Sequence, residues 1–222
     1  MKKYLSWQLP DGEKHFQSHL RKNLQVYGID SYQHKTQLYV IQFLKRRRVF
    51  IDVGSHCGFF SRHFCQRFKL VLAFEPIQEH RECFVKNVPY DNYELYPYAL
   101  GDKEEIKRMC NPASKCSGDY HISEDDKGIE VEVRTLDSFN FKHVDFIKVD
   151  SENFEIFVLK GSKQTILRER PIIMIEQKKH NRYSVGQFDA ARYIESLGMR
   201  LLGKVTDDYI YGWPKNVHNL KS

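Results

Sequence analysis

The chain has 222 residues, of which 41% are hydrophobic and 29% are charged. This composition fits a folded domain with a sizeable core and excludes a largely disordered chain, which would be poorer in apolar and aromatic residues. No apolar run approaches the roughly 20 residues of a membrane span. Residues 1–7 lack the apolar stretch of a signal peptide, so we expect a cytoplasmic protein with no membrane partner.

The cysteines and the charge runs set further limits on the function. The five cysteines are an odd number and form no C-x-x-C pair, so the sequence predicts neither a disulfide framework nor a metal site. The formal net charge of +6 comes largely from local runs, such as the four basic residues 45–48. That run can end a helix and face solvent, or it can attract an anionic partner.

The first 48 residues differ in character from the rest of the chain. Residues 1–48 are polar and helix-rich, and we expect a helical extension that serves as a lid or an oligomer contact. Their clearest helix carries apolar residues from Leu38 to Leu44 and ends at the basic run. From residue 49 onward, short apolar runs alternate with amphipathic stretches, which predicts that residues 49–222 form one α/β domain.

The alternation starts with three predicted strands, at residues 49–53, 70–74 and 93–99. Stretches with helical spacing of apolar residues separate them. This βαβαβ order predicts parallel strands joined by right-handed crossovers. Residues 101–130 are polar and rich in turn residues, so we expect a loop-rich excursion that could include a short edge hairpin.

Regular structure resumes after this excursion and continues almost to the end of the chain. In order, the apolar patterns predict a strand at 144–149, a helix that includes 154–159, a strand at 172–175 and a helix at 188–197. Two strand-like runs then follow at 199–205 and 209–213. A gap of three residues is too short for a parallel crossover, so these runs predict an antiparallel hairpin.

These elements together define the expected fold class. We expect a doubly wound α/β domain with a mostly parallel, seven-stranded sheet and an antiparallel C-terminal hairpin strand. Parallel strands and crossover helices account for most of the chain, and only the last pair departs from that pattern. A mostly parallel sheet closed by one antiparallel strand resembles the fold of class I methyltransferases.

The turn after the first predicted strand has the composition of a ligand site. Asp52 and Gly54 lie at the strand end, and Ser55, Gly58 and Phe59 follow before the next helix. The spacing Asp-x-Gly-x-x-x-Gly differs from the G-x-G-x-x-G of dinucleotide sites. It resembles methyltransferase motif I, in which glycine permits close ligand approach and the carboxylate can face an ammonium group.

The second predicted strand ends in another acidic residue. Glu75, followed by Pro76, lies 21 positions after Gly54. A carboxylate there can accept both ribose hydroxyls, as the acid about 20 residues after the glycine turn does in nucleotide folds. A glycine turn can be an ordinary loop and an acidic strand end a helix cap. Because the glycine turn and Glu75 follow two strands at the carboxyl edge of one doubly wound sheet, a ligand-binding site is favoured over an ordinary loop and a helix cap.

Further short motifs occur in order along the rest of the chain. They are Thr-Leu-Asp at 135–137, Ile-Lys-Val-Asp-Ser-Glu-Asn at 147–153 with Glu155 beyond it, Leu-Lys-Gly at 159–161, and Arg-Pro at 170–171 before a run that ends in Glu176. Over about residues 48–213 the chain resembles the FkbM-type methyltransferase family. That family usually has glycine in place of Asn153, and Asn tolerates the unusual backbone angles of such a turn.

The resemblance implies an S-adenosylmethionine-dependent enzyme that methylates a hydroxyl of a small molecule or saccharide. Asp150 would be the base or acceptor anchor and Glu176 the second candidate, because hydroxyl methylation requires an aligned oxygen and a group that removes its proton. The implied cofactor contacts are Asp52, Gly54, Ser55, Gly58, Phe59, Glu75 and Pro76, with Ala99 and Leu100 near the adenine.

Other interpretations stay open at this point. Asp150 can be a helix N-cap, and Glu152 and Glu155 can simply be favourable first-turn acids. Glu176 and His180 can pair with Lys178 and Arg182 on the surface. A nucleic-acid substrate is possible but not favoured, because the chain lacks the Asn/Asp-Pro-Pro-Tyr/Phe signature of amino-methylating DNA enzymes. A non-catalytic protein that binds an adenosyl ligand is the third alternative.

Overall fold

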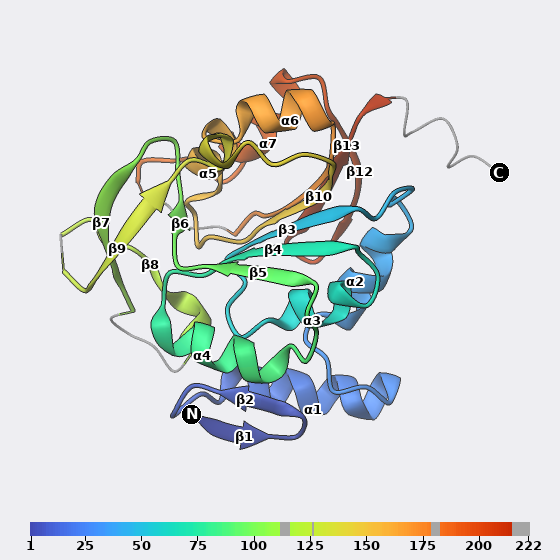
Figure 1. Cartoon of the computed structure of the whole chain (residues 1–222), viewed down its shortest axis with the longest axis vertical. Helices are drawn as coiled ribbons and strands as arrows, with labels where there is room; N and C mark the ends of the chain where they lie inside the picture. The colour runs from blue at the N-terminus through green and yellow to red at the C-terminus, as the bar shows by residue number, and fades with distance from the viewer. Residues whose placement is uncertain (112–115, 126, 179–182, 215–222) are drawn as a thin grey trace.

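The structure is a computed structural model of the chain, and it describes residues 1–111, 116–125, 127–178 and 183–214. In this part of the chain, a seven-stranded sheet forms the centre (Figure 1). All neighbouring strands are parallel except one strand near the C-terminus, which is antiparallel to both of its neighbours. The spatial order is β12 (Arg200–Val205), β13 (Asp208–Gly212), β11 (Ile172–Glu176), β10 (Val144–Val149), β3 (Val49–Val53), β4 (Leu70–Phe74) and β5 (Tyr93–Tyr96).

Helices cover both faces of this sheet, as the two sides of the cartoon show (Figure 1). The helices α5 (Glu155–Lys160), α6 (Lys163–Glu169) and α7 (Asp189–Ser196) pack on one face, and α2 (His34–Ile41), α3 (Phe59–Cys65) and α4 (Gln78–Asn87) pack on the other. Strands buried on both faces are apolar along most of their length. The expected α/β fold with a large, mostly parallel sheet is therefore confirmed. No helix in the described ranges is long and apolar enough to cross a bilayer.

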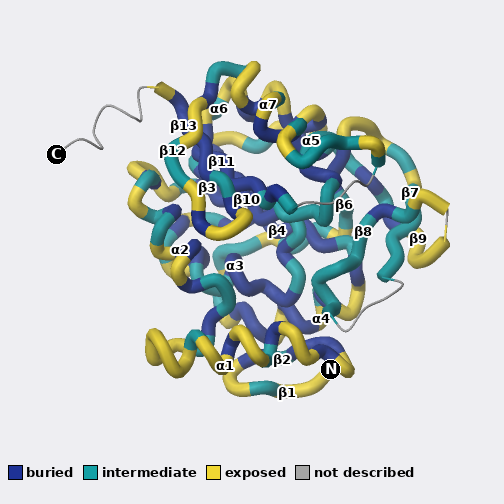
Figure 2. Tube along the Cα trace, turned by 180° about the vertical axis from the view of Figure 1, so that it is seen from behind, coloured by how far each residue is buried: buried dark blue, intermediate teal, exposed yellow. Residues whose placement is uncertain are grey.

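Alternate residues of the central strands feed two separate cores. Ile51 and Ile147 point to the α5–α7 side, whereas Phe50 and Phe146 point to the α2–α4 side. The rings of Phe50 and Phe146 stack with centroids 4.8 Å apart, across the β3–β10 pair. The strands are the most buried part of the tube in Figure 2, and the outer turns of α1 are exposed. This central packing fixes the positions of the strand ends that carry the polar residues.

The N-terminal segment contains a hairpin that the sequence analysis did not predict. The strands β1 (Lys2–Tyr4) and β2 (Trp7–Leu9) pair antiparallel, before the helix α1 (His15–Tyr27). Trp7 is buried against Phe59, with ring centroids 4.8 Å apart. The sequence does not predict this hairpin in the helix-rich opening, because strands of three residues are too short to show an alternation.

The excursion after β5 is more ordered than expected. Pro97 separates β5 from β6 (Ala99–Leu100), so the single strand predicted at 93–99 was wrong. A second sheet, in the order β6-β9-β7-β8, replaces most of the expected loop. Its longer strands are only partly buried, since the strand at 105–110 has no fully buried residue and the strand at 129–134 has two, so their sequences are polar enough to resemble a loop. The other strands are β7 (Glu105–Cys110), β8 (His121–Ile122) and β9 (Ile129–Arg134).

Two of the sequence motifs have a packing role at the end of α5. A Cβ added to Gly161 would lie only 1.9 Å from the carbonyl oxygen of Gly101. The carbonyl of Gly161 accepts a hydrogen bond of 2.9 Å from the backbone N–H of Asp137. The Asp137 carboxylate in turn accepts from the backbone N–H groups of Gln164 and Thr165, at 2.9 and 2.8 Å. The Leu-Lys-Gly and Thr-Leu-Asp motifs thus join α5 to α6.

We expect Gly161→Ala to destabilise the fold strongly, because the new methyl group would overlap a backbone carbonyl that cannot move aside. The loss should be about 3 kcal/mol or more, a fall in Tm on the order of 10 °C in thermal unfolding. Gly186→Ala is the control, since its added Cβ would make only ordinary contacts of 3.4 Å or longer. Equal Tm values for the two variants would contradict the close approach of Gly161 and Gly101.

Candidate functional site

A cavity of about 910 Å³ opens at the carboxyl edge of the central sheet. Its floor includes the ends of β3, β4, β10 and β11, where Gly54, Glu75, Asp150 and Glu176 lie. Doubly wound sheets bind their ligands at this edge, and small-molecule sites span roughly 300–1,000 Å³. The cavity therefore has the place and the size of a site for one or two small molecules.

The structure brings nearly all of the sequence-predicted site residues into this cavity. Gly58 is the exception, because it packs against α4 instead: a Cβ there would lie 2.6 Å from Val88 Cγ2, and its φ is +84°. Gly58 therefore allows the turn to pack closely against α4. The predicted residues that line the cavity are Asp52, Gly54, Ser55, Phe59, Glu75, Pro76, Ala99, Leu100, Asp150 and Glu176.

The glycine turn joins the end of β3 to the end of β10. Gly54 has φ +71°, and a Cβ there would lie 2.0 Å from the carbonyl oxygen of Asp150. The backbone N–H groups of Gly54 and Ser55 both donate to the carbonyl of Phe74, at 3.1 Å. The backbone N–H of Asp150 donates to the carbonyl of Val53 at 3.3 Å. Only glycine permits this close approach, which sets Asp150 directly beside the turn.

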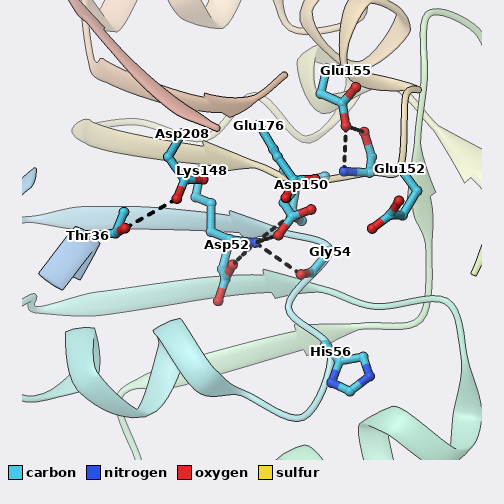
Figure 3. A network of polar contacts seen from close by, with 12 residues as sticks. Thr36, Asp52, Gly54, His56, Lys148, Asp150, Glu152, Glu155, Glu176 and Asp208 are labelled. Atoms are coloured by element: carbon cyan, nitrogen blue, oxygen red, sulfur yellow. Dashed lines mark hydrogen bonds and ion pairs between the residues drawn. The ribbon is translucent and has the colours of Figure 1, made fainter. Parts of the chain in front are cut away.

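A buried lysine connects the same two strand ends (Figure 3). The Nζ of Lys148 lies 3.5 Å from Asp52 Oδ1 and 3.3 Å from Asp150 Oδ2. It also donates to the carbonyls of Val53 and Gly54, at 3.4 and 3.2 Å. Burial disfavours its charge, but the two carboxylates outweigh this effect and raise the pKa of Lys148. Lys148 belongs to the motif at 147–153, but the sequence alone indicated no role for it.

Asp52 is shielded from solvent by its partners. Its side chain is fully buried, and Ser61 Oγ donates to Asp52 Oδ2 at 2.7 Å. Burial raises the pKa of Asp52 even though Lys148 favours the charged form. We expected Asp52 to face a ligand ammonium group. In the structure a resident ammonium, that of Lys148, already faces this carboxylate, so a ligand cation would be the second one there.

Glu75 is held rigidly at the end of β4. Its Oε2 accepts a hydrogen bond of 2.9 Å from the backbone N–H of His56, and its Oε1 accepts one of 2.8 Å from Ile77. His80 Nδ1 lies 3.3 Å from Oε1. Each carboxylate oxygen has two lone pairs, so Oε2 can still accept from a ligand hydroxyl. The buried carboxylate is therefore oriented for hydroxyl groups in the cavity.

Two histidines that the sequence analysis missed stand beside Glu75. The rings of His56 and His80 lie 4.0 Å apart between centroids, and both line the cavity. Burial lowers the pKa of His56 well below its usual value, so its ring is neutral. Within the described ranges, His80 Nε2 and Ser55 Oγ are buried and have no hydrogen-bond partner. Such buried polar atoms need a partner, which a ligand can provide.

Three acidic side chains and a lysine form the other end of the cavity floor. Lys178 Nζ lies 2.8 Å from Glu152 Oε1 and 3.0 Å from Glu176 Oε2. Burial and the charge of Asp150 raise the pKa of Glu176 to about 10. Burial also acts to raise the pKa of Asp150. The charges of Lys148 and Lys178 outweigh burial, so the pKa of Asp150 is lowered. At neutral pH Asp150 is thus ionised and Glu176 protonated.

The alternative roles of these acids can now be judged. Asp150 does not cap the next helix, because α5 begins at Glu155 and the residue before it, Phe154, is the N-cap. Glu176 does pair with Lys178, but inside the cavity and not on the outer surface. His180 and Arg182, the other two residues of the expected surface pairing, lie outside the described residues.

The turn after Asp150 explains why asparagine is tolerated in it. Glu152 and Asn153 both have positive φ values, of 51° and 77°. Asn is one of the few residues that adopt this left-handed conformation readily, which is why it can replace glycine. Glu155 Oε1 closes the turn by accepting from the backbone N–H groups of Ser151 and Asn153, at 2.8 and 3.3 Å. The turn that we expected is therefore kept.

Asp208 is a further acidic residue, which we expected in the three-residue gap between the last two predicted strands. It is instead the first residue of β13, it is buried, and it lines the cavity (Figure 3). Thr36 Oγ1 donates to its Oδ2 at 3.3 Å. Burial raises the pKa of Asp208 to about 7. Its position depends on a contact between segments 172 residues apart, which no local pattern reveals.

The fold and the site define an α/β methyltransferase domain. A family model, the methyltransferase FkbM domain, matches residues 52–201. The chain therefore belongs to the FkbM methyltransferase family, as the motifs indicated. A comparison with curated proteins gave no match.

Solved structures agree with this fold. An FkbM methyltransferase from Methylobacillus flagellatus has 19% identity and a TM-score of 0.52, over 75% of this chain and 44% of its own. This chain thus spans less than half of that protein. A methyltransferase from Geobacter sulfurreducens has 13% identity and a TM-score of 0.52, over 92% and 90% of the two chains. A precorrin-8w decarboxylase from Methanobacterium thermoautotrophicum has 12% identity and a TM-score of 0.55, over 96% and 99%.

We expect Glu155 to make the stability of the protein depend on pH. Burial raises its pKa to about 7 in the folded state, from an ordinary value of 4.5. A raised acid pKa stabilises the fold at low pH, and this contribution is lost as the pH rises from about 5 through 7. Glu155→Gln keeps the accepting oxygen and removes the titration. Between pH 5 and pH 8 the wild type should therefore lose up to about 3 kcal/mol more than the variant.

Urea unfolding at both pH values measures this difference. Glu195→Gln is the control, because Glu195 is an exposed residue of α7 and the substitution removes the same charge from the surface. That variant should keep the pH dependence of the wild type. Parallel pH profiles for wild type and Glu155→Gln would mean that Glu155 is ionised in the folded protein at neutral pH.

Proposed function

We propose that the chain is an S-adenosylmethionine-dependent methyltransferase that methylates a hydroxyl group of a small molecule or saccharide. The observation that carries this proposal is one cavity with two unlike ends, Glu75 at one end and the Asp150–Glu176 pair at the other. When bound, the cofactor supplies a methyl group on a positively charged sulfur. The family membership supports methyl transfer, and the geometry supports the choice of cofactor and acceptor.

The Glu75 end fits the nucleoside part of this cofactor. Glu75 offers an accepting oxygen for ribose hydroxyls, as carboxylates in this position do in nucleotide folds. Ser55 Oγ and His80 Nε2 both belong to residues that line the cavity, and they are two of the buried polar atoms that have no hydrogen-bond partner among the described residues. A flat, apolar purine also fits the side chains around them, which include Phe74, Pro76, Ala99, Leu100 and Ile122.

The other end fits a hydroxyl acceptor. Asp150 is ionised, lines the cavity and is fixed by Lys148 at 3.3 Å. It can accept a hydrogen bond from the acceptor hydroxyl and so align its oxygen. When the bound cofactor supplies its methyl group to this oxygen, Asp150 would take up the proton that the hydroxyl loses. Glu176 already holds a proton, so it is the less suitable base at neutral pH.

The N-terminal segment forms one wall of the cavity. Residues of α1 and of the stretch 32–36 line the cavity, together with the β12–β13 turn. We assign acceptor recognition to this wall, which goes beyond the lid or oligomer contact that we expected for residues 1–48. Over residues 15–35 its cavity-lining side chains include rings and cations but no carboxylate, whereas the β12–β13 turn adds Asp207 and Asp208. The side chains from residues 15–35 include His15, Phe16, His19, Lys22, Asn23, Tyr27, Tyr32, His34 and Lys35. Rings and donors of this kind suit a hydroxyl-rich or anionic acceptor.

The basic run at 45–48 gives a nucleic-acid substrate no support. Its last residue, Arg48, precedes β3 and donates from its backbone N–H and its guanidinium to Asp145, at 2.8 and 2.6 Å. Asp145 lies near the start of β10. The run is therefore at the amino edge of the parallel sheet, opposite the edge that holds the cavity. A polyanion bound there would not reach Asp150.

We expect Glu75→Gln to weaken cofactor binding by about tenfold to a hundredfold, because one hydrogen bond to a charged acceptor is typically worth 1.5–3 kcal/mol. Isothermal titration with S-adenosylhomocysteine measures this loss, and unchanged circular dichroism shows that the variant is folded. Glu82→Gln, on the exposed face of the neighbouring helix α4, is the matched control and should bind like the wild type. No heat from the wild type would overturn the proposed function, and an unchanged Glu75→Gln affinity would overturn the ribose assignment.

We expect Asp150→Asn to keep cofactor affinity within about threefold and to lower methyl transfer by about a hundredfold or more. Glu176→Gln should cost less than about tenfold, because an amide resembles the protonated acid that Glu176 is at neutral pH. Transfer of a labelled methyl group to fractions of a host extract is the assay. A larger loss for Glu176→Gln than for Asp150→Asn would reverse the two roles.

A further inference from the structure

The acidic end of the cavity has the ligand set of a metal site. One carboxylate oxygen each from Asp150, Glu152 and Glu176 lie within 4.8 Å of one another. Carboxylate oxygens are the ligands that hard divalent cations such as Mg²⁺, Ca²⁺ and Mn²⁺ prefer. Three acidic groups at this distance repel one another unless a cation or protons lie between them.

A cation from the chain itself is present at this point. Lys178 Nζ contacts the carboxylates of Glu152 and Glu176, at 2.8 and 3.0 Å. The charge of Asp150 acts on it as well, and together these acids raise the pKa of Lys178 although burial disfavours its charge. An ammonium group has three donors in a compact arrangement, which suits it to bridge several carboxylates.

The backbone shows that this contact is built into the fold. Lys178 follows Glu176 by two residues, directly after β11. Glu152 reaches the lysine from the turn after β10, where it has a positive φ of 51°. Such a backbone conformation is unfavourable for a residue other than glycine. A conformation of this kind persists only where its surroundings stabilise it, and here Lys178 and Glu155 hold the two sides of the turn.

We propose that Lys178 is a built-in counter-ion that takes the place of a divalent cation among Asp150, Glu152 and Glu176. It is a positioning residue, because it fixes the carboxylates without touching the reacting atoms. Its importance for turnover rests on the proposed function. The exclusion of metal by Lys178 does not rest on the proposed function, because metal binding to the three acidic residues can be measured without a cofactor or an acceptor.

Titration of the whole chain with Mn²⁺, followed by electron paramagnetic resonance of the free ion, tests this proposal. The wild type should bind no stoichiometric Mn²⁺ in the submillimolar range. Lys178→Ala should bind one equivalent at least about tenfold more tightly than the wild type, because the three acidic groups then lack a counter-ion and a bound cation can displace the proton of Glu176. The double variant Lys178→Ala with Glu152→Gln should lose that site again. No gain in the folded Lys178→Ala protein would overturn the proposal.

Two further Mn²⁺ titrations test the proposal if the Lys178→Ala variant does not fold. Lys178→Arg keeps a cation among the carboxylates and should exclude Mn²⁺ as the wild type does. If the wild type binds one equivalent of Mn²⁺ and Glu152→Gln removes it, the cluster is a metal site and the proposal is wrong. The titration with S-adenosylhomocysteine is separate, so a failure here and a failure of the proposed function can be told apart.

Discussion

The contact between the buried ammonium of Lys148 and the ends of β3 and β10 is the interaction on which the site depends. A charged group in the core is costly unless it is paired, and Lys148 compensates Asp52 and Asp150 at the same time. It also satisfies two carbonyls of the glycine turn, whose own geometry depends on Gly54. One side chain thus connects the turn beside the Glu75 end of the cavity to Asp150 at the acidic end.

The charges around Asp150 follow from this arrangement. Lys148 contacts Asp150 at 3.3 Å and the charge of Lys178 also favours the ionised form, so the pKa of Asp150 is lowered although burial opposes this, while the pKa of its neighbour Glu176 is raised. Environments that push the pKa values of adjacent acids apart are typical of acid–base sites. The same cations reduce the repulsion between Asp150 and Glu152, which allows the strained turn after β10 to present both carboxylates to the cavity.

The sequence predicted those parts of the fold and site that leave a local pattern. Parallel strands such as β3 and β11 are buried on both faces, so they appear as apolar runs, and Asp52, Glu75 and Asp150 were found because they follow such runs. The half-exposed strand β7 and the three-residue strands of the N-terminal hairpin leave no comparable pattern. Asp208 and the ring-rich wall of α1 reach the cavity only through contacts between distant segments, and periodicity contains no information about them.

The position of these unpredicted residues bears on substrate choice. The family match covers residues 52–201 and includes Glu75, Asp150 and Lys178. The acceptor wall comes from α1, from the stretch 32–36 and from the β12–β13 turn, all of which lie outside that range. Membership of the family therefore accounts for the fold and the strand-end residues of this chain, while the side chains that would select an acceptor belong to its flanks. Under the proposed function, Lys22, Lys35 and the rings beside them distinguish the acceptor of this enzyme from that of relatives that share only the matched region.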